Sequence, residues 1–311
     1  METIGSPLLW GGFIGFVMLM LALDLGVFHK KAHAVSFKEA AIWSCVWVSM
    51  SLLFNAGLWW RFGPTLGTEF LTGYLLEKSL SVDNVFVFII IFSTLKIPGA
   101  SQHRVLFWGI LAALILRAGM IFAGTALLTR FHWLIYVFGA FLIFTGVQLY
   151  RHWKKGEEEG NKLIALAYKY VPSTPNLHGE KFFIVENGKR LATPLFMALV
   201  LVEVSDVVFA LDSIPAIFAV TTDPFIVFTS NIFAILGLRS LYFLLSGMVD
   251  KFGYLKPALA AVLVFVGAKM AGADFFKLPS WVSLIVIAVL LGIGIGASLL
   301  WPPKPEAAKA A

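Results

Sequence analysis

Nine long apolar runs constrain the fold of this chain more than any other feature. Each is long enough to cross the hydrocarbon core of a bilayer as a helix, which takes about 20 residues. Hydrophobic residues make up 59% of the chain and charged residues only 14%, well below the charged share of a soluble domain. We therefore predict an all-α polytopic membrane protein and exclude a soluble enzyme or a disordered chain. The runs are 8–28, 40–60, 70–95, 105–128, 133–150, 194–220, 225–248, 257–276 and 281–300.

The basic residues fall almost entirely on one side of these nine predicted spans. Seventeen of the 24 Lys and Arg residues lie in alternate loops and the C-terminal tail, three lie in the other loops, and four lie inside spans. Short loops rich in Lys and Arg stay in the cytoplasm. We expect a multi-pass protein of the bacterial inner membrane with its N-terminus outside and its C-terminus in the cytoplasm. The net charge of +6 then comes from loop residues that set the orientation in the membrane. The expected partner is therefore the lipid bilayer and not a nucleic acid.

The longest polar stretch, 152–193, separates the fifth and sixth spans. Apolar-rich segments flank Asn187-Gly188 in it, which is a pattern typical of a β-hairpin. This cytoplasmic insert is also a candidate docking surface for membrane protein partners. The predicted organisation is two N-terminal spans (1–69), a first three-span unit (70–151), the insert (152–193), a second three-span unit (194–276), and a final span with a cytoplasmic tail (277–311).

Polar landmarks recur in the same order in the two three-span units. Because each unit has an odd number of spans and the connection between them stays in the cytoplasm, the second unit must enter the membrane upside down. This predicts an inverted repeat of two three-helix units, which is typical of secondary transporters with binding sites near the bilayer midplane. The matched landmarks are Glu77 with Asp206, Asp83-Asn84 with Asp212-Ser213, Leu116-Arg117 with Leu238-Arg239, and Phe144-Thr145-Gly146 with Phe265-Val266-Gly267.

Five carboxylates lie close to the midpoints of the spans that begin the two units. Each is within about 7.5 Å of its midpoint at the rise of an α-helix. One charge at that depth costs at least ~2.5 kcal/mol, so five of them indicate a functional site. The structural alternative is ion pairing with Arg117 and Arg239, which also lie near span centres. The five acids are Glu77, Asp83, Glu203, Asp206 and Asp212.

The donor types at this depth favour a hard divalent cation. Carboxylates, Asn84 and Ser213 offer oxygen ligands, while all six histidines lie in loops or at span ends and Cys45 is the single cysteine. Oxygen ligands suit Mn²⁺, Mg²⁺ or Ca²⁺. If Arg117, Arg239 and Lys78 balance three of the acids, one divalent cation would neutralise the other two. No organic cofactor is expected.

Two further residues are candidate gates. Asp24 lies near the cytoplasmic end of the first span, where it is either an entry ligand or an interfacial charge. Pro215 removes a helical hydrogen bond and frees the carbonyl of Leu211 beside Asp212. That carbonyl is either an extra ligand or part of a packing kink.

The two acidic motifs, 76–87 and 203–221, resemble those of the TerC family of integral membrane proteins. The opening Pro7-Leu8-Leu9-Trp10-Gly11 and the full length resemble the Alx branch of that family. The resemblance implies the inverted three-helix repeats of the lysine-exporter superfamily and a link to manganese export, alkaline-pH-responsive expression and tellurium resistance. It is the resemblance alone that selects manganese. It also implies a functional acidic site formed by Glu77, Asp83, Asn84, Glu203, Asp206, Asp212 and Ser213.

The leading hypothesis is a secondary transporter, not an enzyme, that exports Mn²⁺ from the cytoplasm by alternating access. Arg117 and Arg239 would balance the empty site, and protons are a candidate counter-ion because clustered acids titrate as a set. A rival hypothesis is a metal-binding membrane scaffold in metal delivery or tellurium-resistance complexes. The neighbouring carboxylates disfavour oxyanion transport by like-charge repulsion, and the repeat disfavours a membrane-embedded hydrolase.

Overall fold

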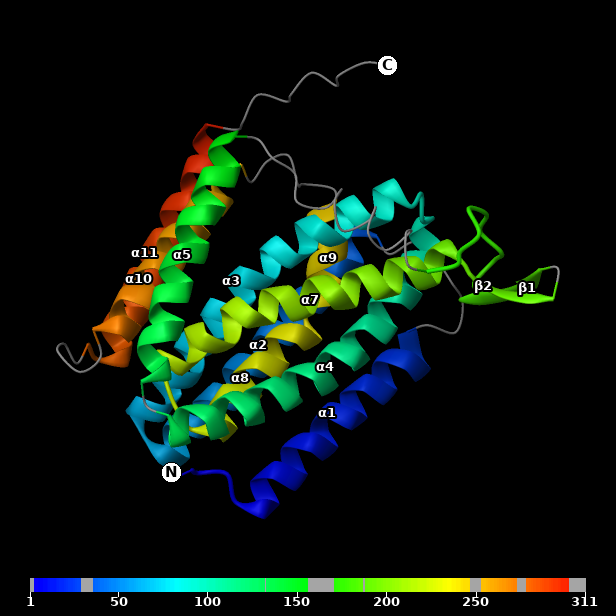
Figure 1. Cartoon of the computed structure of the whole chain (residues 1–311). Helices are drawn as coiled ribbons and strands as arrows, with labels where there is room; N and C mark the ends of the chain where they lie inside the picture. The colour runs from blue at the N-terminus through cyan, green and yellow to red at the C-terminus, as the bar shows by residue number, and fades with distance from the viewer. Residues whose placement is uncertain are drawn as a thin grey trace.

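The computed structural model describes residues 3–28, 36–131, 133–155, 171–186, 188–246, 253–272 and 278–301. The chain is a helical bundle with one small hairpin (Figure 1). Its elements are α1 (Pro7–Phe28), α2 (Phe37–Phe62), α3 (Pro64–Thr94), α4 (Gly99–Arg130), α5 (Leu134–Lys155), β1 (Phe183–Glu186), β2 (Lys189–Ala192), α7 (Pro194–Phe218), α8 (Pro224–Leu236), α9 (Leu238–Ser246), α10 (Leu255–Ala271) and α11 (Ser280–Leu300).

Six of the described segments are long and apolar enough to cross a membrane: α2, α4, α5, α7, α8 together with α9, and α11. The chain is therefore a multi-pass helical membrane protein. The helices α1, α3 and α10 coincide with three further predicted spans but are less clear candidates. The described apolar part of α1 is short, α3 carries several charged residues, and α10 has 17 residues.

Figure 1 shows two groups of helices whose axes cross. The helices α3, α4 and α7 run side by side with α8 and α9 packed against them, and α5, α10 and α11 form the second group. The contacts between helices have a reciprocal pattern, because α3 packs on both α7 and α8 while α7 packs on both α3 and α4. The most extensive helix pair is α5 with α10.

Hydrogen bonds between distant segments show which helix ends share a face. The Thr3 hydroxyl donates to Asp223 at 2.9 Å, which joins the N-terminal segment to the turn between α7 and α8. The Tyr254 amide donates to the Ser298 hydroxyl at 3.0 Å, which joins the start of α10 to the end of α11. In Figure 1 the N-terminus lies at the opposite end of the bundle from the hairpin.

Glycines bring the backbones of α5 and α10 into direct contact. A methyl group built on Gly146 would lie 2.8 Å from the Ala260 carbonyl oxygen, and one on Gly267 would lie 2.7 Å from the Gly139 carbonyl oxygen. Any larger residue at Gly146 or Gly267 would therefore push the two helices apart. This pair forms one wall of the site described below.

The seventh predicted span, 225–248, is not one continuous helix. It breaks at Gly237, between α8 and α9. The ammonium of Lys78 reaches the break from α3 and lies 3.5 Å from the Ala234 carbonyl oxygen. A methyl group on Gly237 would lie 2.6 Å from that ammonium nitrogen. A cation is favourable at the C-terminal, negative end of a helix dipole, so Lys78 stabilises the termination of α8 at Leu236.

The hairpin lies where the insert was predicted to form one. Strand β1 pairs antiparallel with β2, from Phe183 opposite Ala192 to Glu186 opposite Lys189. Asn187 of the predicted turn lies outside the described residues, and Gly188 has the positive φ of 74° that a tight turn requires. The predicted tail within 302–311 is also outside the described part of the chain.

Candidate functional site

The guanidinium of Arg117 is the centre of a buried polar network. Arg117 lies on α4 and is 1% exposed. It donates to a carboxylate oxygen of Glu77 on α3, to both carboxylate oxygens of Asp206 on α7 at 2.9 and 3.2 Å, and to the Asn231 side-chain oxygen on α8 at 3.2 Å. One side chain thus links four helices, all of them in the two predicted three-span units, and two of these helices, α3 and α7, carry the acids.

Inside an apolar bundle the charges of this network are stable only when they are paired. An ion removed from water is tolerated only with good partners and further hydrogen bonds, and the flat guanidinium fork suits two carboxylates at once. Asn84 adds a further bond, because its amide donates to Asp206 at 3.3 Å. If Glu77 and Asp206 are ionised, the three charged groups carry one net negative charge.

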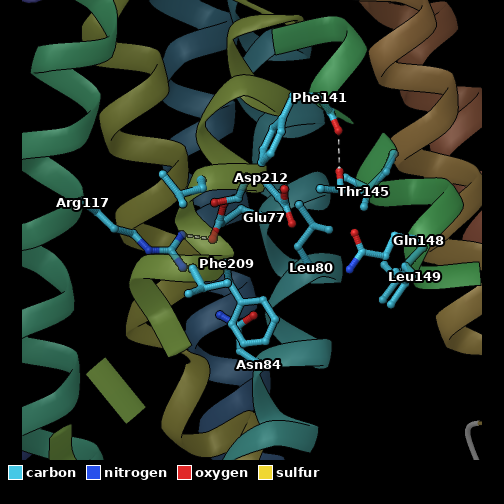
Figure 2. Close-up of a pocket in the computed structure, with 15 residues that line it drawn as sticks. Glu77, Leu80, Asn84, Arg117, Phe141, Thr145, Gln148, Leu149, Phe209 and Asp212 are labelled. Carbon is cyan, nitrogen blue, oxygen red and sulfur yellow. Dashed lines mark hydrogen bonds and ion pairs between the residues drawn. The ribbon is translucent and has the colours of Figure 1, made fainter. Parts of the chain in front are cut away.

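A cavity of about 200 Å³ adjoins the network. Figure 2 shows Arg117 reaching it from one side, while Thr145 and Gln148 of α5 approach from the other. Its polar lining consists of Glu77, Asn84, Arg117, Thr145, Gln148, Asp212 and Ser213, and apolar side chains complete the wall. The structure therefore collects acids and amides from α3, α5 and α7 around one space.

Two oxygens at this cavity are buried without a hydrogen-bond partner, the side-chain oxygen of Asn84 and the hydroxyl of Ser213. Buried polar atoms nearly always have a partner, so these two oxygens are available to a water molecule or an ion in the cavity. Both belong to the predicted site. With the carboxylates of Glu77 and Asp212 they offer oxygen donors of the kind that hard divalent cations prefer.

Glu203 does not line this cavity. It lies beside α4 in a separate small pocket with Asp206 and Arg239, and a methyl group on Gly109 would lie 3.2 Å from its carboxylate. Both carboxylate oxygens of Glu203 are buried without a hydrogen-bond partner. The helical spacing of Glu203 and Asp206 places them on one side of α7, but only Asp206 reaches the Arg117 network.

The remaining predicted residues are placed only in part. The side chains of Asp24 and Asp83 are outside the described part of the structure. Pro215 is buried near the end of α7. Within the described ranges no three His, Cys, Asp or Glu side chains converge closely enough to hold a metal ion by themselves. A cation here would therefore need amide and hydroxyl oxygens as well as carboxylates.

The fifth span contributes two polar side chains that the predicted acidic site did not include. Thr145 and Gln148 lie on α5 and line the cavity, and the Thr145 hydroxyl donates to the Phe141 carbonyl at 3.0 Å. The usable signal was a polar pair one turn apart in an otherwise apolar run.

Comparisons with known proteins agree with the helical architecture. Residues 62–305 match the sequence model of the integral membrane protein TerC family. An uncharacterized membrane protein of Myxococcus xanthus, STKORF319, is 68% identical over 305 residues, covering 96% of this chain and 95% of its own. An Escherichia coli K12 relative is 52% identical over 301 residues, with 94% of both chains covered. It is called "Putative membrane-bound redox modulator Alx". No solved structure matches this chain.

Proposed function

Because the chain belongs to the TerC family of integral membrane proteins, we propose that it is a secondary transporter that exports a divalent cation, Mn²⁺, from the cytoplasm. The observation that carries the proposal is the cavity beside Arg117. It combines the carboxylates of Glu77 and Asp212 with the partnerless oxygens of Asn84 and Ser213. Manganese is chosen over Mg²⁺ and Ca²⁺ on family resemblance.

The inverted repeat of two three-helix units is part of the proposal, and the helix contacts support it. If α3, α4 and α5 correspond to α7, α8–α9 and α10, a two-fold axis exchanges the α3–α8 contact with the α7–α4 contact. The contacts between α5 and α10 are also symmetric under this exchange. Gly146 of α5 lies against Ala260 of α10, and its counterpart Gly267 of α10 lies against Gly139 of α5. In each helix the contacted residue precedes the matched glycine by the same number of positions.

Nine spans with an external N-terminus also agree with two hydrogen bonds that join distant helix ends. The bond from Thr3 to Asp223 places the N-terminus and the α7–α8 turn on one side. The bond from Tyr254 to Ser298 places the start of α10 and the end of α11 on one side. Both agree with an odd number of spans and with the basic loops in the cytoplasm.

In the proposed transport step the cation competes with Arg117 for Glu77. The ion binds the Glu77 and Asp212 carboxylates and the oxygens of Asn84 and Ser213. Arg117 keeps its two bonds to Asp206 and so remains a paired charge. When the ion leaves, Arg117 returns to Glu77, which prevents an unbalanced negative site in the membrane. A proton gradient is the proposed driving force, with protons carried by the same group of acids.

The test is Mn²⁺ flux into liposomes that contain the purified full chain, with and without a proton gradient. Asp212→Asn should abolish flux because it removes a cavity charge while keeping the shape of the side chain. The matched control is Glu186→Gln on the hairpin, far from the cavity, which should transport normally. Unchanged flux in folded Asp212→Asn would refute the site.

The same preparation separates transport from the scaffold hypothesis. Equilibrium binding of Mn²⁺ by the purified chain, measured by calorimetry, should weaken in Asp212→Asn under either hypothesis. Only a transporter moves the ion across the liposome membrane. Binding without flux under every gradient would therefore refute export and favour a metal-delivering scaffold.

A further inference from the structure

The hairpin is fixed to the bundle at the level where α7 begins. Thr193 lies between Ala192 of β2 and the first residue of α7 and is fully buried. Its hydroxyl donates to the Lys181 carbonyl at 2.6 Å and its amide donates to the Phe182 carbonyl at 3.0 Å. The segments on either side of the hairpin are thus joined at one point. The hairpin cannot move far from the end of this span.

Two aromatic contacts set the depth of the hairpin. The ring of Phe183 lies 4.3 Å from that of Phe196, in the first turn of α7. The guanidinium of Arg104, near the start of α4, lies 5.0 Å from the ring of Phe182 and forms an ion pair with Glu180 at 3.1 Å. Both contacts lie at the ends of predicted spans, so they hold the hairpin at the level where α4 and α7 begin. Each four-residue strand is only about 13 Å long, so the hairpin stays close to that level.

One face of the hairpin combines apolar and cationic side chains. The strand register places Phe183, Val185 and Arg190 on the same side. Val185 is 75% exposed and Phe183 is 36% exposed, and the guanidinium of Arg190 lies 4.2 Å above the Phe183 ring. Lys181 and His178 line the same surface hollow. The outer face of the hairpin thus presents apolar side chains directly beside a guanidinium.

The charged side chains around this hairpin face indicate which kind of partner it binds. Of the two acids beside the hairpin, Glu180 pairs with Arg104, while Glu186 lines the same hollow as Lys181 and Arg190 and lies opposite Lys189 in the strand register. Lys181 and Arg190 remain as exposed cations beside apolar side chains. Basic residues next to the cytoplasmic end of a span attract anionic lipid. Phosphate is well matched to a guanidinium.

We infer that the hairpin face formed by Phe183, Val185, Arg190 and Lys181 is a membrane-surface anchor that binds the phosphate of an anionic lipid. Val185 and Phe183 enter the headgroup region, while Arg190 and Lys181 bind the phosphate. This site would hold the cytoplasmic end of α7 against the bilayer. It does not depend on the identity of the transported ion.

The test uses a fluorescent label on the hairpin of the full chain. The single cysteine is removed by Cys45→Ser, and Val185→Cys carries an environment-sensitive dye. The protein is placed in nanodiscs of phosphatidylcholine with increasing phosphatidylglycerol. We expect a blue shift of the dye as phosphatidylglycerol is added. Arg190→Gln should raise the phosphatidylglycerol fraction needed for half of the shift by about fivefold, the factor for one surface cation.

The matched control is Arg61→Gln. Arg61 is also an exposed arginine beside a phenylalanine, with its guanidinium 5.4 Å from the Phe62 ring, but it lies in the last turn of α2. It should leave the titration unchanged. An unaltered thermal unfolding midpoint would show that each variant is folded. A dye that stays water-exposed in every lipid would overturn the inference in favour of a protein-docking face. A blue shift that is equal in pure phosphatidylcholine would overturn the anionic-lipid site.

Discussion

Glu77 and Asp206 share a single guanidinium, that of Arg117. They are matched positions of the proposed repeat, so the arginine lies where a two-fold axis between the units would pass. Only one arginine can occupy that place. Its counterpart, Arg239, lines the pocket of Glu203 instead. Arg117 and Arg239, which are matched in the proposed repeat, therefore have different surroundings in this structure.

Arg117→Gln should destabilise the protein strongly. It leaves Glu77 and Asp206 without their cation, and breaking a buried ion pair from one side costs about 3–5 kcal/mol. The thermal unfolding midpoint in nanodiscs measures the effect. Arg104→Gln is the matched control, because its ion pair with Glu180 has side chains 37% and 48% exposed and should contribute less than about 1 kcal/mol. Equal losses in the two variants would show that the Arg117 network is not a structural centre.

The contact of α5 with α10 gives a second prediction. Gly267→Ala places a methyl group 2.7 Å from the Gly139 carbonyl oxygen, and such overpacking costs about 1–3 kcal/mol. Gly292→Ala on α11 is the control, because no atom lies within 4 Å of its added methyl group. It should be neutral or slightly stabilising, since Ala favours a helix more than Gly. The unfolding midpoint should therefore fall in Gly267→Ala and stay level or rise in Gly292→Ala. Equal midpoints in the two variants would mean that the tight contact is not present.

Much of this architecture follows from local chemistry that a single sequence displays. Apolar runs long enough to span a bilayer predict helices, and the Asn-Gly pair predicts the hairpin that β1 and β2 form. The charges of Arg117, Glu77 and Asp206 could be predicted to pair, because an apolar interior offers isolated charges no other favourable arrangement.

The sequence could not reveal features that depend on how helices are placed in space. The contact of Lys78 with the helix break at Gly237 depends on how α3 lies against α8 and α9. The position of Glu203 outside the cavity depends on Gly109 of α4 leaving room for its carboxylate. The cavity wall formed by Gln148 depends on the position of α5, which packs closely against α10 at its glycines. Helical periodicity gives the side of a helix but not its neighbour.

Gln148→Met should weaken cation binding without unfolding the protein. Methionine has a similar length but no amide oxygen, so the cavity loses a hard donor on its α5 side. The apparent KM for Mn²⁺ in the liposome assay should rise about tenfold, as for the loss of a group that supports a metal site. Gln148→Glu is the reciprocal control and should lower KM, because it adds a charged oxygen. The same KM in both variants would place the ion path away from α5.

Cysteine labelling can decide whether α7 crosses the membrane and in which direction. In a Cys45→Ser background, Thr222→Cys lies in the exposed turn between α7 and α8, which shares a face with the N-terminal segment through Asp223. Gly188→Cys lies in the exposed hairpin. A membrane-impermeant maleimide should label Thr222→Cys in intact cells, and Gly188→Cys only after the membrane is opened. The opposite result would reverse the orientation. Labelling of both in intact cells would mean that α7 does not cross the membrane. That result would refute the inverted repeat, in which α7 is the first span of the second unit.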